Sequence, residues 1–156
     1  MVRLDHLSLP VADWRKSRDW YKHNLGFEVE FEIPDRQTAA MRDDADLTVF
    51  LYEHEVAPCP GISLTIQVDD VEAKHRELSA AGVAFVHPPM KVFWGYGAEL
   101  CDPDGYRLRL WDQTTMREKA GGYRRASRDL PQCAVEPSFF RRPGESRDPL
   151  LHHHGC

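Results

Sequence analysis

The chain has 156 residues, of which 42% are apolar and 29% charged, with a formal net charge of −5. These values are typical of one globular domain that can bury a core. The acidic balance, with a pI near 5.9, argues against the basic surface that nucleic-acid binding needs. No apolar run approaches the ~20 residues of a membrane span. The start of the chain lacks the pattern of a signal peptide, so we expect a cytoplasmic protein without membrane or nucleic-acid partners.

The first half of the chain predicts a strand, a helix and three further strands. Residues 6–13 alternate apolar and polar side chains, as a strand does, and end in Asp13, a good helix N-cap. Helical spacing of apolar residues follows, and Gly26 is placed to end the helix in a left-handed conformation. Further strands are expected at about residues 27–31, 38–42 and 47–52.

The second half repeats this order after a Pro-Cys-Pro-Gly linker. Residues 63–70 again predict a strand ending in an N-cap aspartate, and Gly82 is placed to close the helix. Strands are expected at about residues 83–86, 96–101 and 106–112, the last two joined by the turn Asp-Pro-Asp-Gly. The repeat therefore predicts an α+β fold of two βαβββ modules, about residues 2–56 and 61–115. They are expected to form an open, cup-shaped mixed sheet with helices on the outside.

The residues after 115 differ in composition from the rest. They are rich in Arg, Pro, Gly and Ser, and their few apolar residues follow neither strand nor helix spacing. We expect a domain over residues 1–115 and a poorly ordered extension over 116–156. The four cysteines show no paired spacing, so free thiols are expected.

Strand alternation divides the side chains into a core set and a cup set. In the last strand, Leu108 and Leu110 are expected in the core, and Arg109 and Trp111 on the opposite face. The loop 93–97 holds two glycines that let its aromatic residues close over a ligand. The expected cup residues are His6, Phe50, Tyr52, Ser63, Trp94, Tyr96, Glu99, Arg109 and Trp111. Aromatic surface with a few polar groups is typical of a small-molecule pocket, although a solvated sheet face with incidental aromatics would show the same pattern.

Three segments together resemble the vicinal oxygen chelate superfamily over about residues 2–114: DHLSLPV, WYKHNLGFEV and YGAELCDPDGYRLRLWD. Members of that superfamily include glyoxalase I, extradiol dioxygenases, fosfomycin-resistance transferases and bleomycin-resistance proteins. The resemblance implies a paired βαβββ fold, in agreement with the internal repeat. It also implies a homodimer, because the cups of the family are often completed by a second copy.

The resemblance further implies metal ligands at four strand positions, of which this chain keeps one. The first position falls on His6, and the others fall on Phe50, Ser63 and Arg109. A phenyl ring cannot bind a metal, and a guanidinium is permanently charged and repels a cation. We therefore expect neither a metal nor a cofactor. Four other histidines are expected on helices, turns or edges and receive no role: His23, His54, His75 and His87.

Arg109 is the most informative departure from the family pattern. A guanidinium there can hold a carboxylate, phosphate or sulfonate, or it can pair with Glu99 across neighbouring strands. These residues favour a metal-independent binding protein of the bleomycin-resistance type, which holds an aromatic or anionic compound in the cup. The alternative is an enzyme: a glyoxalase-like metal-dependent lyase, isomerase or dioxygenase with an atypical site, or a metal-free one using His6 and Glu99. A protein-binding module is a third interpretation, and the sequence identifies no catalytic residue.

Overall fold

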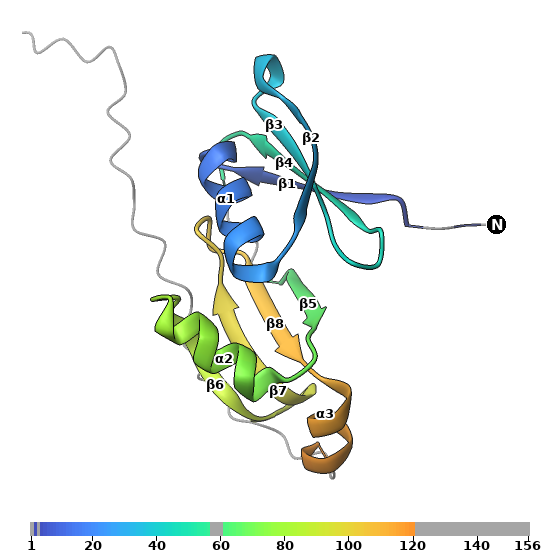
Figure 1. Cartoon of the computed structure of the whole chain (residues 1–156), viewed down its shortest axis with the longest axis vertical. Coiled ribbons are helices and arrows are strands. Elements are labelled where there is room, and N and C mark those ends of the chain that lie inside the picture. The colour runs from blue at the N-terminus through green and yellow to red at the C-terminus, as the bar shows by residue number, and fades with distance from the viewer. Residues whose placement is uncertain (1, 3, 57–60, 121–156) are drawn as a thin grey trace, which may run out of the picture.

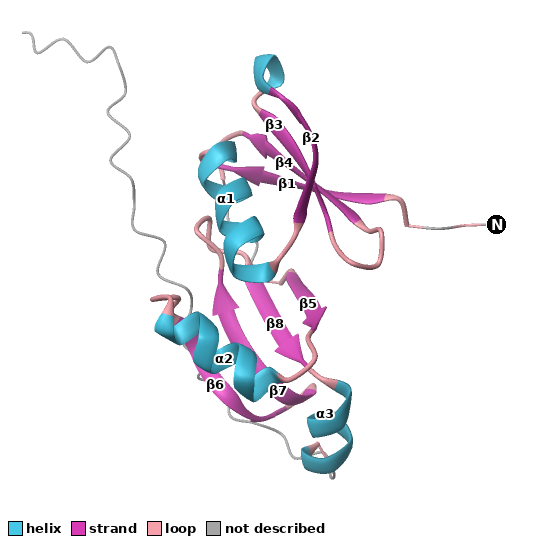
Figure 2. Ribbon diagram, viewed as in Figure 1, coloured by secondary structure: helices cyan, strands magenta, loops and turns pink. Residues whose placement is uncertain are grey.

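The computed structural model describes residues 2, 4–56 and 61–120, which fold into two βαβββ modules placed end to end (Figures 1 and 2). The first module consists of β1 (His6–Val11), α1 (Trp14–Leu25), β2 (Glu28–Ile33), a 3₁₀ turn (Pro34–Arg36), β3 (Thr38–Arg42) and β4 (Thr48–Glu53). The second consists of β5 (Ser63–Gln67), α2 (Val71–Ala80), β6 (Phe85–Val92), β7 (Gly95–Cys101) and β8 (Arg107–Trp111), followed by α3 (Gln113–Lys119). The predicted α+β fold with two modules is confirmed.

Each module has its own four-stranded mixed sheet, and the two sheets have the same topology. The strand orders are β1-β4-β3-β2 and β5-β8-β7-β6. In both sheets the first strand of the module runs parallel to the last, while the remaining neighbours are antiparallel. The internal repeat in the sequence is therefore a repeat of strand pairing.

The helix ends follow the chemistry expected of their residues. The carboxylate of Asp13 accepts hydrogen bonds from the first amides of α1, and that of Asp70 accepts one from Ala73 in α2. Gly26 adopts a left-handed φ of 75° directly after α1, a conformation that glycine reaches at little cost. These caps fix where each helix leaves and rejoins its sheet.

One face of each sheet packs against its helix. In the first module the buried side chains of β3 and β4, including Met41 and Leu51, pack with Trp14 and Tyr21 of α1. In the second, alternate residues of β7 and β8 pack against Val71 and Leu78 of α2; they are Ala98, Leu100, Leu108 and Leu110. The opposite faces, which point away from α1 and α2, carry most of the candidate site.

The turn between β7 and β8 joins the two modules. Asp104 accepts hydrogen bonds from the backbone amide of Ala12 at 2.7 Å and from the Ser17 hydroxyl at 2.6 Å. Asp102 accepts one from the Tyr21 hydroxyl at 2.8 Å. Because both carboxylates are buried, this junction fixes α1 of the first module to the second.

Two elements differ from the sequence expectation. Strand β6 continues through Pro88 and Pro89, where the sequence suggested an end near residue 86. Prolines are tolerated at sheet edges and bulges, and β6 is an edge strand with register shifts on both sides of His87. Helix α3 crosses the expected domain end, so the packed part of the chain reaches Lys119; the extension beyond residue 120 lies outside the described residues.

Cys101 is disulfide-bonded, which corrects the expectation of free thiols for this residue. The other three cysteines lie outside the described residues. Among the helices described here, none has the length and apolar character needed to cross a membrane.

Candidate functional site

The open face of the second sheet carries a buried carboxylate held by two arginines. The Glu99 side chain is only 1% exposed. One of its oxygens accepts a hydrogen bond from Arg107 at 2.6 Å, and the other accepts one from Nε of Arg109 at 3.0 Å. The cross-strand pair of Arg109 with Glu99, one of the two roles considered for Arg109, is thus confirmed.

The guanidinium of Arg109 is also flanked by the aromatic turn between β6 and β7. Its central carbon lies 5.3 Å from the ring centroid of Phe93 and 5.7 Å from that of Trp94. Trp94 can lie there because residue 97 is a glycine: a Cβ at Gly97 would collide with the Trp94 ring and with the Leu110 carbonyl oxygen. The sequence predicted Arg109, Glu99 and Trp94 at one face, and the structure adds the ring of Phe93.

The first sheet carries a separate polar hollow. Its volume is about 380 Å³, and its walls are residues of the first module: Asp5, His6, Glu30, Phe31, Arg42, Asp46, Thr48 and Phe50. The rings of His6 and Phe50 meet edge to face with centroids 4.8 Å apart, and Nδ1 of His6 lies 3.0 Å from a carboxylate oxygen of Asp5. His6 and Phe50 are therefore brought together, as alternation on β1 and β4 predicted.

The contacts of the predicted site residues fall into two groups, one for each module. Among the described residues, no hydrogen bond, ion pair or ring contact that the structure gives joins the His6 group to the Arg109 group. Ser63 lies opposite Arg107 in register and Trp111 opposite Gln67, both half-buried at the two ends of the β5–β8 pair. Tyr52 is half-buried on β4, with its ring 6.2 Å from that of His54.

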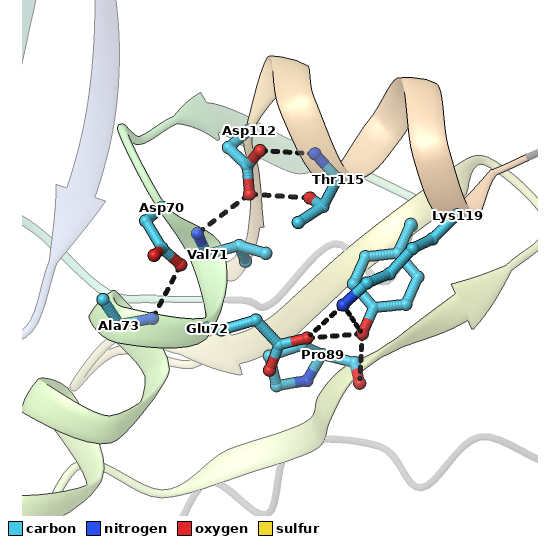
Figure 3. A network of polar contacts seen from close by, with 9 residues as sticks. Asp70, Val71, Glu72, Ala73, Pro89, Asp112, Thr115 and Lys119 are labelled. Atoms are coloured by element: carbon cyan, nitrogen blue, oxygen red, sulfur yellow. Dashed lines mark hydrogen bonds and ion pairs between the residues drawn. The ribbon is translucent and has the colours of Figure 1, made fainter.

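Tyr96 lies on the helix-covered face, which corrects the expectation that it faces the cup. It lies in β7, as the predicted strand over residues 96–101 implied, and its hydroxyl donates to Oε1 of Glu72 in α2 at 2.6 Å. Lys119 of α3 binds the same carboxylate at 3.0 Å (Figure 3). Tyr96 and Glu99 lie three residues apart on β7, so their side chains point to opposite faces of the sheet. The residue instead attaches α3 and α2 to the sheet.

At the junction between the modules, one buried carboxylate, that of Asp102, has a raised pKa. Burial raises the pKa of Asp102 to about 6, and the negative charge of Asp104 adds to the rise, while hydrogen bonds from Tyr21 and Tyr106 oppose it. The pKa of Tyr21 is raised well above its usual value by burial and by Asp102. The junction is packed within the core of the modules, and we assign it to stability rather than to ligand binding.

One buried polar residue of the open face was missed from the sequence. His87 of β6 lies directly opposite Glu99 in register and is 5% exposed. The sequence gave no signal for it, because the two prolines that follow suggested that the strand had already ended. The register of β6 could be found only from the folded sheet.

The resemblance implies metal ligands at four strand positions, and the residues there do not form a four-ligand metal site. His6 is the only one with a metal-binding side chain, and its neighbour at the second position is the phenyl ring of Phe50. Arg109 places a permanent positive charge at the fourth position, already paired with Glu99. Over the described ranges, no group of three or more His, Cys, Asp or Glu side chains could hold a metal ion.

A comparison with protein-family models identifies the family of this chain. The model of the Glyoxalase/Bleomycin resistance protein/Dioxygenase superfamily matches residues 3–110. The chain belongs to this superfamily. A search of curated proteins gave no match.

Solved structures with the superfamily fold agree with this assignment. TnmS3, an antibiotic binding protein from Streptomyces sp. CB03234, is 28% identical with a TM-score of 0.61, covering 72% of this chain and 96% of its own. A member of the glyoxalase/bleomycin resistance protein/dioxygenase superfamily from Sphaerobacter thermophilus DSM 20745 is 25% identical, with a TM-score of 0.61 and coverages of 72% and 98%. A structure described as a possible glyoxalase from Bacillus cereus is 20% identical with a TM-score of 0.62, covering 70% of this chain and 98% of its own. This likeness concerns the fold alone.

Proposed function

We propose that this superfamily member is a metal-independent small-molecule binding protein of the bleomycin-resistance type, which holds an aromatic anion at Arg109. The site is the open face of the second sheet, where Arg109 lies beside the aromatic turn. The similarity to an antibiotic binding protein is consistent with capture of a small molecule. Binding of this kind requires shape and charge complementarity but no catalytic group.

The observation that carries the proposal is that most N–H donors of the Arg109 guanidinium remain available to a ligand. Of its five N–H donors, the structure gives one a partner among the described residues, the Nε donor to Glu99. The terminal nitrogens can therefore still form two parallel hydrogen bonds to a carboxylate or sulfonate, the strongest type of anion contact. The Glu99 pair fixes the guanidinium plane, which lowers the entropy lost when an anion binds.

The neighbouring rings set the shape of the ligand. Phe93 is exposed and Trp94 half-buried, so both offer apolar area beside the guanidinium. Aromatic rings favour offset-stacked or edge-to-face contacts with another ring. An aromatic acid can use both features at once, with its anion on Arg109 and its ring on Trp94.

The test is binding of 2-naphthoate to the full chain and to two matched variants, measured by isothermal titration calorimetry. Arg109→Gln removes the proposed anion contact and is expected to weaken binding at least tenfold, which is about 1.4 kcal/mol. Arg42→Gln makes the same chemical change on the open face of the other sheet, where Arg42 pairs with Glu28, and should leave the affinity unchanged. Equal effects of both substitutions, or no binding to the wild type, would refute the proposal.

We also propose that the protein pairs as a homodimer. The His6 group and the Arg109 group lie on separate sheets of one chain, and exposed apolar side chains remain on both modules, including Phe31, Ile33, Met90 and Phe93. A second copy could cover these residues and bring the two kinds of open face together. Light scattering coupled to size-exclusion chromatography should give twice the monomer mass of 18.0 kDa.

A second candidate, an enzyme with an atypical site, is favoured by the His6–Asp5 pair at the border of the first-module hollow. A carboxylate on Nδ1 orients an imidazole so that Nε2 can act as a base or as a metal ligand. Stoichiometric metal in protein purified from cells, lost on His6→Ala, would favour this candidate over simple binding. Arg109-dependent binding without such metal would favour the first.

A further inference from the structure

His87 completes a row of polar side chains that crosses the open face of the second sheet. The register places His87 of β6 opposite Glu99 of β7, Glu99 opposite Arg109 of β8, and Arg109 opposite Thr65 of β5. Side chains of residues directly opposite each other project to the same face. His87 therefore lies in the same row as the proposed anion site, with Glu99 between the two.

The hydrogen bonding of His87 fixes its tautomer. Nδ1 lies 2.9 Å from the carbonyl oxygen of Pro88. A carbonyl oxygen can only accept a hydrogen bond, so Nδ1 must carry the proton. Nε2 of the neutral ring is then an acceptor with a free lone pair.

This acceptor has no partner within the described part of the chain. His87 is 5% exposed, and its Nε2 is buried without a hydrogen bond. The adjacent carboxylate cannot supply one, because Glu99 is itself an acceptor and binds an arginine through each oxygen. A buried polar atom without a partner destabilises the fold, and a bound donor would remove this penalty.

We propose that His87 is the second anchor of the ligand site, where Nε2 accepts a hydrogen bond from a hydroxyl group of the bound molecule. This inference rests on the proposed function, in which Arg109 binds the anionic end of an aromatic compound. It narrows the ligand class to hydroxylated aromatic acids. The hydroxyl must lie at the end of the molecule opposite the acid.

The spacing of the strands sets the size of this molecule. Neighbouring strands lie about 4.8 Å apart, so His87 and Arg109, which flank Glu99 on either side, have backbones roughly 10 Å apart. A single benzene ring is short for that span. Two fused rings with the acid and the hydroxyl at opposite ends match it better, as in 6-hydroxy-2-naphthoate.

Three probes separate the hydroxyl contact from the anion contact: 2-naphthoate, 6-hydroxy-2-naphthoate and 6-methoxy-2-naphthoate, which cannot donate. The wild type is expected to bind the hydroxy acid at least fivefold more tightly than the other two. His87→Phe removes the acceptor and should abolish that preference. His23→Phe, an exposed histidine on α1, is the matched control and should keep the preference.

A spectroscopic readout covers the case in which His87→Phe fails to fold. In ¹⁵N-labelled wild type, Nε2 of His87 should resonate as an unprotonated nitrogen, and its signal should move on addition of the hydroxy acid but not of the methoxy acid. Absence of any hydroxyl preference, or a preference that survives in a folded His87→Phe, overturns the role of His87 while Arg109-dependent binding stands. Failure of all three acids to bind overturns the proposed function and this inference with it.

Discussion

Replacing Asp102 by asparagine is expected to change how the stability of the fold depends on pH. Asp102 is buried at the junction between the modules, and its pKa is raised from 3.8 to about 6 in the folded chain. The folded state therefore binds the proton of Asp102 more tightly than the unfolded state does. Between about pH 4 and pH 6 the folded chain carries more protons, so the free energy of unfolding falls as the pH rises through this window and levels off above it.

The size of the effect follows from the shift. A rise from 3.8 to about 6 corresponds to roughly 3 kcal/mol, at 1.36 kcal/mol for each pKa unit. Asparagine has the shape of the protonated acid but cannot ionise. Because pH 4 already lies above the unfolded pKa, the free energy of unfolding of Asp102→Asn, relative to the wild type, should rise by about 2 kcal/mol between pH 4 and pH 7.

Urea denaturation followed by far-UV circular dichroism, at intervals from pH 4 to pH 8, measures this difference directly. Other ionisable groups are common to both proteins, so their contributions largely cancel in the difference. Tyr21→Phe is a companion variant: it removes the hydroxyl that lowers the pKa of Asp102, so the decline in stability should extend above pH 6. A relative stability that changes by less than about 1 kcal/mol across the range would refute the reasoning.

Three further predictions concern the core, the aromatic turn and α3. Leu108→Ala removes a fully buried side chain and should lower the free energy of unfolding by about 2–5 kcal/mol. A loss below about 1 kcal/mol in urea titrations would contradict the central position of Leu108 in the core. Gly97→Ala adds a Cβ that meets the Trp94 ring and the Leu110 carbonyl, so tryptophan fluorescence should change and naphthoate binding should weaken; an unchanged spectrum would be inconsistent with this packing. Lys119→Met removes an exposed ion pair and should leave the urea midpoint close to that of the wild type, so a clear fall in the midpoint would show that α3 depends on this charge.

Much of the architecture could be predicted from local chemistry repeated along the chain. The N-cap residues Asp13 and Asp70 and the left-handed Gly26 lie where the sequence placed them. Alternation along the strands also separated the core from the open face, with Leu108 inward and Arg109 outward. These features depend on neighbours within a few residues, which a sequence displays directly.

The features that were missed depend on contacts between distant segments. The strand β6 can continue through Pro88 because it lies at the edge of its sheet. This continuation pairs His87 with Glu99. Tyr96 was expected to face the cup because the loop was drawn as residues 93–97, although the β6–β7 hairpin needs only Phe93 and Trp94 for its turn. The division of the site between two sheets likewise follows from the assembly of the modules.

The carboxylate of Asp112 links two helices that are far apart in sequence. It accepts hydrogen bonds from the amide of Thr115 in α3 and from the amide of Val71, the first residue of α2 (Figure 3). Unwinding α3 would remove one set of donors but leave the other still in place. Shortening the chain before Asp112, by contrast, would deprive the start of α2 of a buried acceptor and loosen a helix that begins about forty residues earlier, so trimmed versions of this protein should retain Asp112 to keep the second module intact.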